Sequence, residues 1–375
     1  MDTDTQKGGH MTISVAERAD LRSAVHDLLQ DRCTEHDVRR VMSSADGFDR
    51  ALWSELAAQG VTGLLVDADY GGVGLGPLEL EVVAEEIGAA LLPGPWLASA
   101  VLTVALIQAS GADDDKQRLL PGLADGTSIG TVAMTGARGT WAADGVAVRA
   151  DADGVLHGTA HYVLHGQVAD VLLVVASTGV GDVGIFETAP DAPGLQRTAA
   201  TVFDPTVPLS TFAFDGTPAR RLGTAGWAAV QHALDLAVIA LAGEQVGGTR
   251  RVFDITMDYL KTRIQFGRPI GSFQALKHMA ADLLLDVESA ISAARHAASR
   301  LDADPETAGG AIALAGFTCA DAYHSTAMQA IQMHGGIGFT WEHPAHLFLR
   351  RARTGQQLFG GAAPHRERYL SSKGA

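Results

Sequence analysis

The last third of the chain constrains the fold more than any other part, because four long helical segments follow one another there. They cover about residues 227–262, 273–301, 305–334 and 343–359. The string FGRPIGS, with its proline and glycines, separates the first two. Helices joined by short turns pack antiparallel, since a short connection forces the chain to reverse. The sequence therefore predicts a four-helix bundle over residues 223–375.

The first part of the chain has the same helical texture in shorter pieces. Apolar residues recur every three and four positions in blocks such as VAERADLRSAVHDLLQDRC and LELEVVAEEIGAALL. The glycine-rich loop DADYGGVGLGP lacks the spacing of a dinucleotide-binding fingerprint, so we interpret it as a tight turn. We predict a helical domain over residues 15–125 and a flexible arm or tag remnant over residues 1–14.

The middle of the chain, residues 126–222, changes to short β-branched runs separated by Asp-Gly, Gly-Thr and proline breaks. The string VAVRADADGVLHGTA predicts a hairpin closed at Asp153 and Gly154. These patterns indicate a small antiparallel β domain. The predicted fold class is α+β and mainly α, with an N-terminal helical domain, a small antiparallel β domain and a C-terminal four-helix bundle.

Charge and cysteine content exclude several functions. The formal net charge of -15 argues against a nucleic-acid partner, which would require clustered Lys and Arg. The two cysteines, Cys33 and Cys319, fit a reducing compartment and lack metal or redox spacing. We find no signal-peptide pattern and no apolar run long enough to span a membrane, so we expect a cytoplasmic protein without a membrane span.

Metal-dependent and hydrolytic chemistry lack their sequence signatures. His343 and His346 are spaced for one helix face, but no third ligand is indicated, so no metal site is predicted. The chain also carries no G-x-S-x-G nucleophile motif.

Three strings resemble the acyl-CoA dehydrogenase family. They are YLKTRIQFGRPIGSFQALKHMAADLLLDVESA (259–290), QMHGGIGFTWEHPAHLFLRRAR (332–353) and the β-domain run GVLHGTAHYVLHGQVADVLLVVA. The resemblance covers about residues 15–370. It implies an acyl-CoA substrate, FAD bound at a subunit interface of a homo- or hetero-tetramer, and an electron-transfer flavoprotein or similar acceptor. It also implies α-proton abstraction by a glutamate and β-hydride transfer to the flavin, which forms an α,β double bond.

The same resemblance assigns cofactor-binding residues in the C-terminal segment. Arg263 matches the arginine that reaches the FAD pyrophosphate, a role suited to a forked cation. Phe266 would pack beside the cofactor, and Gln274 would lie near its adenosine half. Taken alone, Arg263 could equally be a surface cation at a helix end.

Further cofactor contacts are implied by two other strings. Gln332, Gly335 and Gly336 match the segment of a neighbouring subunit that closes over the cofactor, where close backbone approach leaves no room for Cβ. The glycine pair could instead simply end a helix. In the β domain, the family loop that hydrogen-bonds flavin and substrate reads MTGARGTW, which retains only Thr135.

The catalytic base departs from the family pattern. One usual glutamate position falls on Phe359 in TGQQLFGG, and the other falls on Ala237. Neither side chain accepts a proton. Glu244 follows Ala237 by seven residues, which is about two helical turns and nearly the same face. We therefore treat Glu244 as the candidate base.

Glu244 also has a structural interpretation, as an ion-pair partner of Arg250, Arg251 or Lys277. A second departure lies in the β domain, where the family triplet whose hydroxyl approaches the flavin is YVL at residues 162–164.

These losses leave three functional hypotheses. The chain resembles the branch in which paralogous chains form α2β2 heterotetramers, which implies sterol side chains or similarly bulky acyl groups. The first hypothesis is an FAD-dependent acyl-CoA dehydrogenase subunit, and the second is a catalytically silent partner of an active paralogue. The third is a flavin oxidase or monooxygenase on the same fold.

Overall fold

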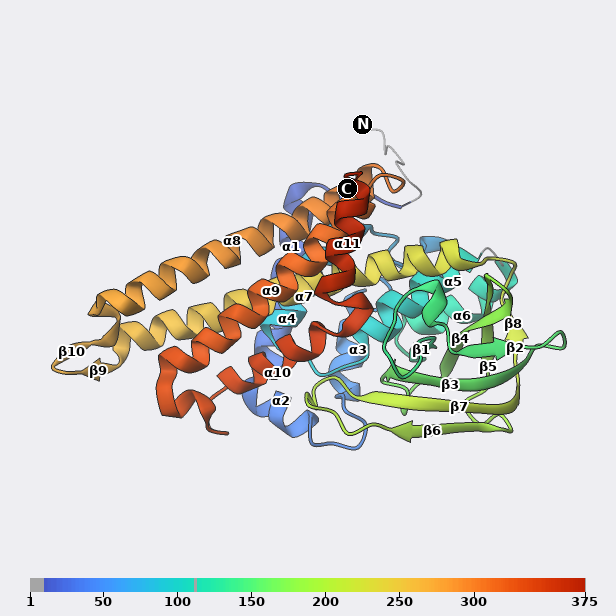
Figure 1. The fold of residues 1–375 in the computed structure, drawn as a ribbon, viewed down its shortest axis with the longest axis horizontal. Helices are drawn as coiled ribbons and strands as arrows, with labels where there is room; N and C mark the ends of the chain where they lie inside the picture. Colours follow the sequence, from blue (N-terminus) through green and yellow to red (C-terminus); the bar gives the residue numbers. More distant parts are fainter. Residues whose placement is uncertain (1–9, 111–112, 375) are drawn as a thin grey trace. The chain divides into compact units, whose positions relative to one another are not determined.

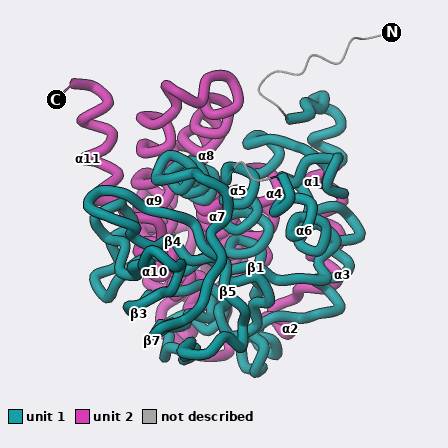
Figure 2. The backbone as a smooth tube through the Cα atoms, turned by 90° about the vertical axis from the view of Figure 1, so that its right-hand side faces the viewer, with its two compact units in different colours: residues 1–20, 39–80, 93–238 teal, residues 21–38, 81–92, 239–375 magenta. Residues whose placement is uncertain are grey.

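The protein is described here by a computed structural model that covers residues 10–110 and 113–374. The described chain forms two compact units, each built from separate segments (Figure 2). Unit 1 comprises the described parts of residues 1–20, 39–80 and 93–238, and unit 2 those of 21–38, 81–92 and 239–375. The division falls inside four of the described helices, so it does not follow the changes of secondary structure on which the predicted domain boundaries rest. Those boundaries remain predictions.

The N-terminal segment is helical, as predicted. Its helices are α1 (Val15–Arg32), α2 (Glu35–Val41), α3 (Arg50–Ala58), η1 (Ala68–Tyr70), α4 (Pro77–Ala89), η2 (Leu97–Thr103), α5 (Val104–Ser110) and α6 (Asp113–Ala124). The start of α3 illustrates the local rule, since the Asp49 carboxylate accepts hydrogen bonds from the backbone N–H groups of Ala51 and Leu52. The glycine-rich loop is a turn, with Gly71 in the left-handed region at φ 85°.

Within the described residues, unit 1 contains an eight-stranded sheet of order β6-β7-β3-β2-β4-β5-β8, with β1 also paired to β4. The strands are β1 (Gly130–Ala133), β2 (Val148–Ala150), β3 (Val155–Leu164), β4 (Val171–Gly179), β5 (Asp182–Thr188), β6 (Leu195–Ala199), β7 (Leu209–Pro218) and β8 (Arg220–Arg221). A short helix, η3 (Ala143–Gly145), lies between β1 and β2.

The sheet is mixed, whereas the sequence predicted an antiparallel one. Strand β4 pairs in parallel with both β1 and β2, while the other pairings are antiparallel. A hairpin turn imposes antiparallel pairing only on consecutive strands, and β4 is not consecutive with β1 or β2. The predicted hairpin itself is confirmed, because β2 pairs antiparallel with β3 and Gly154 adopts φ 79° in the turn.

The C-terminal segment is the predicted bundle. Its elements are α7 (Trp227–Thr262), β9 (Ile264–Gln265), β10 (Arg268–Pro269), η4 (Ile270–Ser272), α8 (Gln274–Ala303), α9 (Gly309–His334), η5 (Gly335–Phe339), α10 (Ala345–Gly355), η6 (Leu358–Gly360) and α11 (Ala362–Ser372). The last predicted helix is shorter than expected. Phe359 has φ 54°, which right-handed helices exclude, so α10 and α11 are separate.

Two glycines allow α4 and α7 to cross at backbone contact within unit 2. A Cβ added to Gly88 would lie 1.9 Å from the carbonyl oxygen of Glu244, and one added to Gly247 would lie 1.8 Å from that of Glu85. Both distances are far below van der Waals contact. The crossing therefore requires glycine on both helices and places Glu244 beside the end of α4.

Candidate functional site

A small apolar core gathers the predicted cofactor-binding elements at one end of the bundle. Leu260 of α7, Leu283 of α8 and Met333 of α9 are buried against one another, with Ile270 and Leu276 packed around them. Residues from α7, η4, α8 and α9 are thereby held together. Figure 1 shows the β9–β10 turn and the junction after α9 at the same left-hand end of the bundle. We call this region the bundle end.

Arg263, Phe266 and Gln274 all lie at the bundle end and face solvent. Arg263 follows α7, Phe266 occupies the β9–β10 turn and Gln274 begins α8. The Arg263 and Gln274 side chains make no hydrogen bond or ion pair to any residue that the structure describes. Phe266 is 91% exposed and has φ 53°, an uncommon conformation for a bulky side chain. The fold of this chain thus leaves these three residues available to a ligand.

The charge of the bundle end suits an anion. Arg263, Arg268 and Lys277 form no ion pair with a described carboxylate. Arg268 instead stacks over the Phe273 ring, with its guanidinium carbon 4.2 Å from the ring centroid. Fixed cations without carboxylate partners favour phosphate groups.

Gln332, Gly335 and Gly336 lie at the end of α9 and the start of η5. Gln332 is exposed and its amide has no partner in the described chain. Gly335 adopts φ 66°, which explains why glycine is needed there. Gly336 does not have such a conformation, and a Cβ built on it meets nothing within 4 Å. Packing within this chain therefore gives no reason for glycine at position 336.

Thr135 lies in unit 1, just after β1, and its side chain is already engaged. Its hydroxyl donates to the Gly136 carbonyl at 3.0 Å, and its own carbonyl accepts from the backbone N–H of His161. Tyr162, two strand positions before Leu164, has φ 58°, and its phenol donates to the Ala137 carbonyl at 2.9 Å. Leu164 is buried, so the position offers no polar group.

Glu244 forms a buried ion pair with Arg351. The Arg351 guanidinium donates to Glu244 Oε1 at 2.6 Å, and both side chains are at most 8% exposed. Arg351 also donates to the backbone carbonyls of Leu91 and Leu92, at 3.3 and 3.1 Å. These carbonyls follow α4, where a helix leaves acceptors without intrahelical partners. Arg351 therefore joins three segments of unit 2, α7, α10 and the end of α4.

This ion pair differs from the structural pairing that the sequence suggested. The predicted partners were Arg250, Arg251 and Lys277, but the partner is Arg351. Spacing along α7 cannot predict it, because Arg351 is distant in sequence and lies on another helix. The two usual base positions lie in apolar surroundings, with Ala237 fully buried and Phe359 4% exposed.

A second buried carboxylate cluster in unit 2 escaped the sequence analysis. Glu85 of α4 is surrounded by Arg22, Arg250 and Arg295, with the Arg250 and Arg295 nitrogens 3.2 and 3.5 Å from its carboxylate. Glu81 lies one helical turn earlier and is only 2% exposed. Burial and the neighbouring Glu85 carboxylate raise the pKa of Glu81 well above its ordinary range. The signal was present in LELEVVAEE, where acidic residues repeat at helical spacing among apolar ones.

The raised pKa of Glu81 predicts how stability depends on pH. A carboxyl whose pKa is higher in the folded than in the unfolded protein takes up a proton on folding. Its contribution is complete below the unfolded pKa, near 4.5, and is lost as pH rises toward the folded value. We expect Glu81→Gln to match the wild type at pH 4.5 and to exceed it increasingly as pH rises above that value, as measured by urea unfolding. A difference between the two proteins that stays constant with pH would contradict this assignment.

Neither a metal site nor a membrane span is formed by the part of the chain that the structure describes. No group of three or more His, Cys, Asp or Glu side chains in that part is arranged to hold a metal ion. The His343 ring lies against the His334 ring in a tilted arrangement, with ring centroids 4.2 Å apart. No helix among the described residues has both the length and the apolarity needed to cross a membrane.

Comparison with known proteins gives one consistent match along the chain. The family description "Acyl-CoA dehydrogenase, N-terminal domain" matches residues 16–127, and "Acyl-CoA dehydrogenase, C-terminal domain" matches residues 224–369. The chain is 32% identical to acyl-CoA dehydrogenase IpdE2 of Mycobacterium tuberculosis, over 91% of this chain and 92% of that protein.

Solved structures agree with the sequence comparison. A chain of the ChsE4–ChsE5 complex from Mycobacterium tuberculosis superposes with a TM-score of 0.88 at 31% identity, covering 97% of this chain and 98% of that one. A chain of the Tcur3481–Tcur3483 steroid ACAD gives a TM-score of 0.85 at 28% identity, covering 96% and 98%. The protein therefore belongs to the acyl-CoA dehydrogenase family, whose members are flavin oxidoreductases acting on CH–CH bonds.

Proposed function

We propose that this chain is one subunit of a heteromeric, FAD-dependent acyl-CoA dehydrogenase that introduces an α,β double bond into an acyl-CoA thioester. The observation that carries the proposal is a difference between the residues for the cofactor and the positions for the catalytic base. At the bundle end the Arg263, Gln274 and Gln332 side chains have no partner in the described chain, whereas both usual base positions are apolar and Glu244 is paired with Arg351.

The residues at the bundle end fit FAD. Arg263 would hold the pyrophosphate, Gln274 the adenosine half, and Phe266 one side of the cofactor. Gln332, Gly335 and Gly336 would close over the cofactor bound to a neighbouring subunit, which gives Gly336 the reason for glycine that its own chain lacks. The chemistry that bound FAD supplies is acceptance of the hydride from the acyl β-carbon. In the β domain we propose Thr135 as a further cofactor residue, because it is retained from the family loop that hydrogen-bonds flavin and substrate.

The proposed second chain is a paralogue that supplies the base. α-Proton abstraction requires a carboxylate that is free to accept a proton. Glu244 accepts a 2.6 Å hydrogen bond from Arg351 and is closed off from solvent, which favours the structural interpretation of this residue. The heteromeric complexes among the solved relatives support a two-chain assembly.

Other features of the proposal follow the family. We propose a tetramer of two chain types in the cytoplasm, with an electron-transfer flavoprotein or a similar acceptor. A bulky acyl group of the sterol side-chain type is the proposed substrate, because one solved relative is described as a steroid ACAD.

The visible spectrum tests the two-chain assembly. We expect the chain purified alone to hold well below one FAD, and its complex with the proposed paralogous partner to hold FAD that is bleached by a steroid side-chain CoA thioester. Within the complex, Arg263→Gln should lower FAD content, because it removes the pyrophosphate cation. Arg300→Gln, which changes an exposed arginine of α8, is the matched control. Stoichiometric FAD and bleaching in the lone chain would establish a self-sufficient enzyme instead.

Glutamine at position 244 tests the candidate base directly. Glu244→Gln keeps a hydrogen-bond acceptor for Arg351 but cannot take a proton. If the partner chain supplies the base, we expect the rate of FAD reduction in the complex to stay within about fivefold of wild type, since only structural hydrogen bonding changes. Loss of reduction with FAD still bound would instead identify Glu244 as the base. Stopped-flow absorbance under anaerobic conditions measures the rate.

A complex that binds FAD but never bleaches with any acyl-CoA would point to a silent assembly. Two explanations would then remain, a catalytically silent subunit and an unsuitable substrate. Pairing this chain with a different paralogue, one that is active and carries its own base, distinguishes them.

A further inference from the structure

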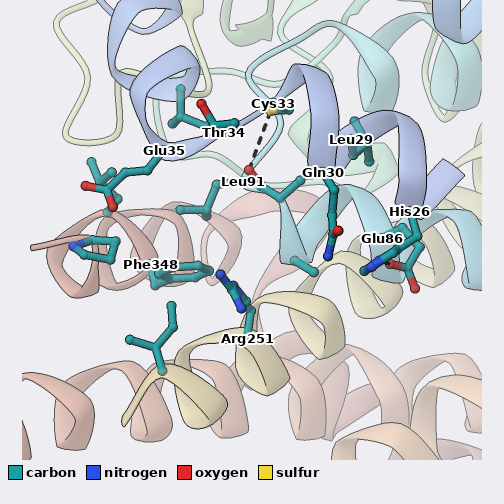
Figure 3. A pocket seen from close by; sticks show the side chains of 16 residues that line it. His26, Leu29, Gln30, Cys33, Thr34, Glu35, Glu86, Leu91, Arg251 and Phe348 are labelled. Carbon is teal, nitrogen blue, oxygen red and sulfur yellow. Dashed lines mark hydrogen bonds and ion pairs between the residues drawn. The ribbon is translucent and has the colours of Figure 1, made fainter. Parts of the chain in front are cut away.

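Unit 2 contains a cavity of about 370 Å³ whose lining shares no residue with the bundle end and that the proposed dehydrogenation does not use. Its walls come from α1, α2, the end of α4, the middle of α7 and α10 (Figure 3). Cavities of about 300–1,000 Å³ accommodate small organic ligands. A cavity of this size could hold many ligands, so the chemical class of the ligand has to be inferred from the residues that line it.

The floor of the cavity is apolar. Leu29, Leu91, Leu347 and Phe348 line it, and each is at most 4% exposed. Their positions are fixed by the surrounding helices. A hydrocarbon body placed against them would be removed from water, which favours binding in proportion to the apolar area buried.

Two polar donors face the cavity from opposite walls. Figure 3 shows the Arg251 side chain extending from α7 beside Phe348, and the Gln30 amide extending from α1 toward the same space. Neither side chain makes a hydrogen bond or ion pair to a residue in the described part of the chain. The neighbouring Arg250, by contrast, is engaged with Glu85.

The acidic groups of the cavity are already occupied. Glu86 pairs with His26 at 2.8 Å and with Arg22 at 3.7 Å. Glu35, near the opening, has partners of its own. The charge left without a partner is therefore the single guanidinium of Arg251.

We propose that this cavity binds a small carboxylic acid with an apolar body. The carboxylate would accept hydrogen bonds from the Arg251 guanidinium and the Gln30 amide, and the hydrocarbon would lie on the floor formed by Leu29, Leu91, Leu347 and Phe348. An arginine fork matches the two oxygens of a carboxylate, which sets this class apart from alcohols and amines. The site is independent of FAD and of the acyl-CoA site proposed above.

Octanoate is a suitable probe, with 1-octanol and octylammonium as molecules of similar body and different charge. We expect isothermal titration calorimetry on the assembled complex to rank octanoate first and octylammonium last. Arg251→Gln should weaken octanoate binding about tenfold or more, because it removes a charge-assisted hydrogen bond. Arg300→Gln should leave it unchanged, since Arg300 belongs to α8, which contributes no residue to the cavity lining.

A second variant tests whether octanoate binds in this cavity. Ala89→Trp places a large ring in the cavity from the end of α4 and should abolish octanoate binding, while FAD content and the far-ultraviolet circular dichroism stay at wild-type levels. Octanoate binding that survives both Arg251→Gln and Ala89→Trp would place the acid elsewhere, as would equal binding of octylammonium. Either result would overturn the inference.

Discussion

Replacement of Arg351 by methionine is expected to lower the free energy of unfolding by about 3–5 kcal/mol. The variant leaves the Glu244 carboxylate buried at 6% exposure with no cation beside it. It also removes the donors to the Leu91 and Leu92 carbonyls at the end of α4. Urea unfolding followed by circular dichroism, on wild type and variant at pH 7, measures the loss.

Two further variants serve as controls for Arg351→Met. Arg353→Met changes an exposed arginine two residues along α10 and should cost less than about 1 kcal/mol, as surface substitutions usually do. The double variant Glu244→Leu with Arg351→Met removes both charges and should recover much of the loss, because apolar replacement of a complete buried pair is often tolerated. A small loss for the single variant would mean that the ion pair does not organise unit 2, and the case for a structural Glu244 would fail with it.

Alanine at Gly247 is the other substitution with a large expected effect. In an ordinary helix this change stabilises by about 0.5–1 kcal/mol, because alanine has less freedom to lose on folding. Here the new Cβ would lie 1.8 Å from the Glu85 carbonyl oxygen, a backbone atom that cannot move aside as a side chain can. We expect α4 and α7 to separate and the free energy of unfolding to fall by about 3 kcal/mol.

The control for Gly247 is Gly336→Ala. A Cβ there meets no atom within 4 Å, so stability should stay within about 0.5 kcal/mol of wild type. If Gly247→Ala were as stable as Gly336→Ala, the close crossing of α4 and α7 would not exist in the protein. Hydrogen exchange of the α4 amides would detect the same separation locally.

Local sequence patterns predicted much of the fold. The boundaries of α7 follow from continuous helical patterning that ends at FGRPIGS, and the β2–β3 hairpin follows from Asp-Gly between alternating runs. The same reasoning failed for β4, whose parallel partners β1 and β2 are chosen by tertiary packing. It also merged α10 with the following turn, since the positive φ of Phe359 has no signature in a run of ordinary residues.

The sequence likewise predicted some residues of the candidate site and not others. Family strings located Arg263, Gln274 and Gly336 on the chain, and the buried contacts among Leu260, Leu283 and Met333 explain why they meet at one end of unit 2. Arg251 appeared in the sequence only as a possible partner for Glu244. Its place in a cavity with Gln30 depends on α1 and α7 being adjacent, which their sequence separation does not reveal.

The sequence by itself determined the helical bundle, the β-rich middle and the membership of the acyl-CoA dehydrogenase family, because these depend on periodicity and on contiguous motifs. The tertiary structure alone decided the state of Glu244. Spacing along a helix showed which face the carboxylate occupies, but not what lies opposite that face. The partner, Arg351, lies on α10, 107 residues later in the chain, and meets Glu244 only through the packing of α10 against α7.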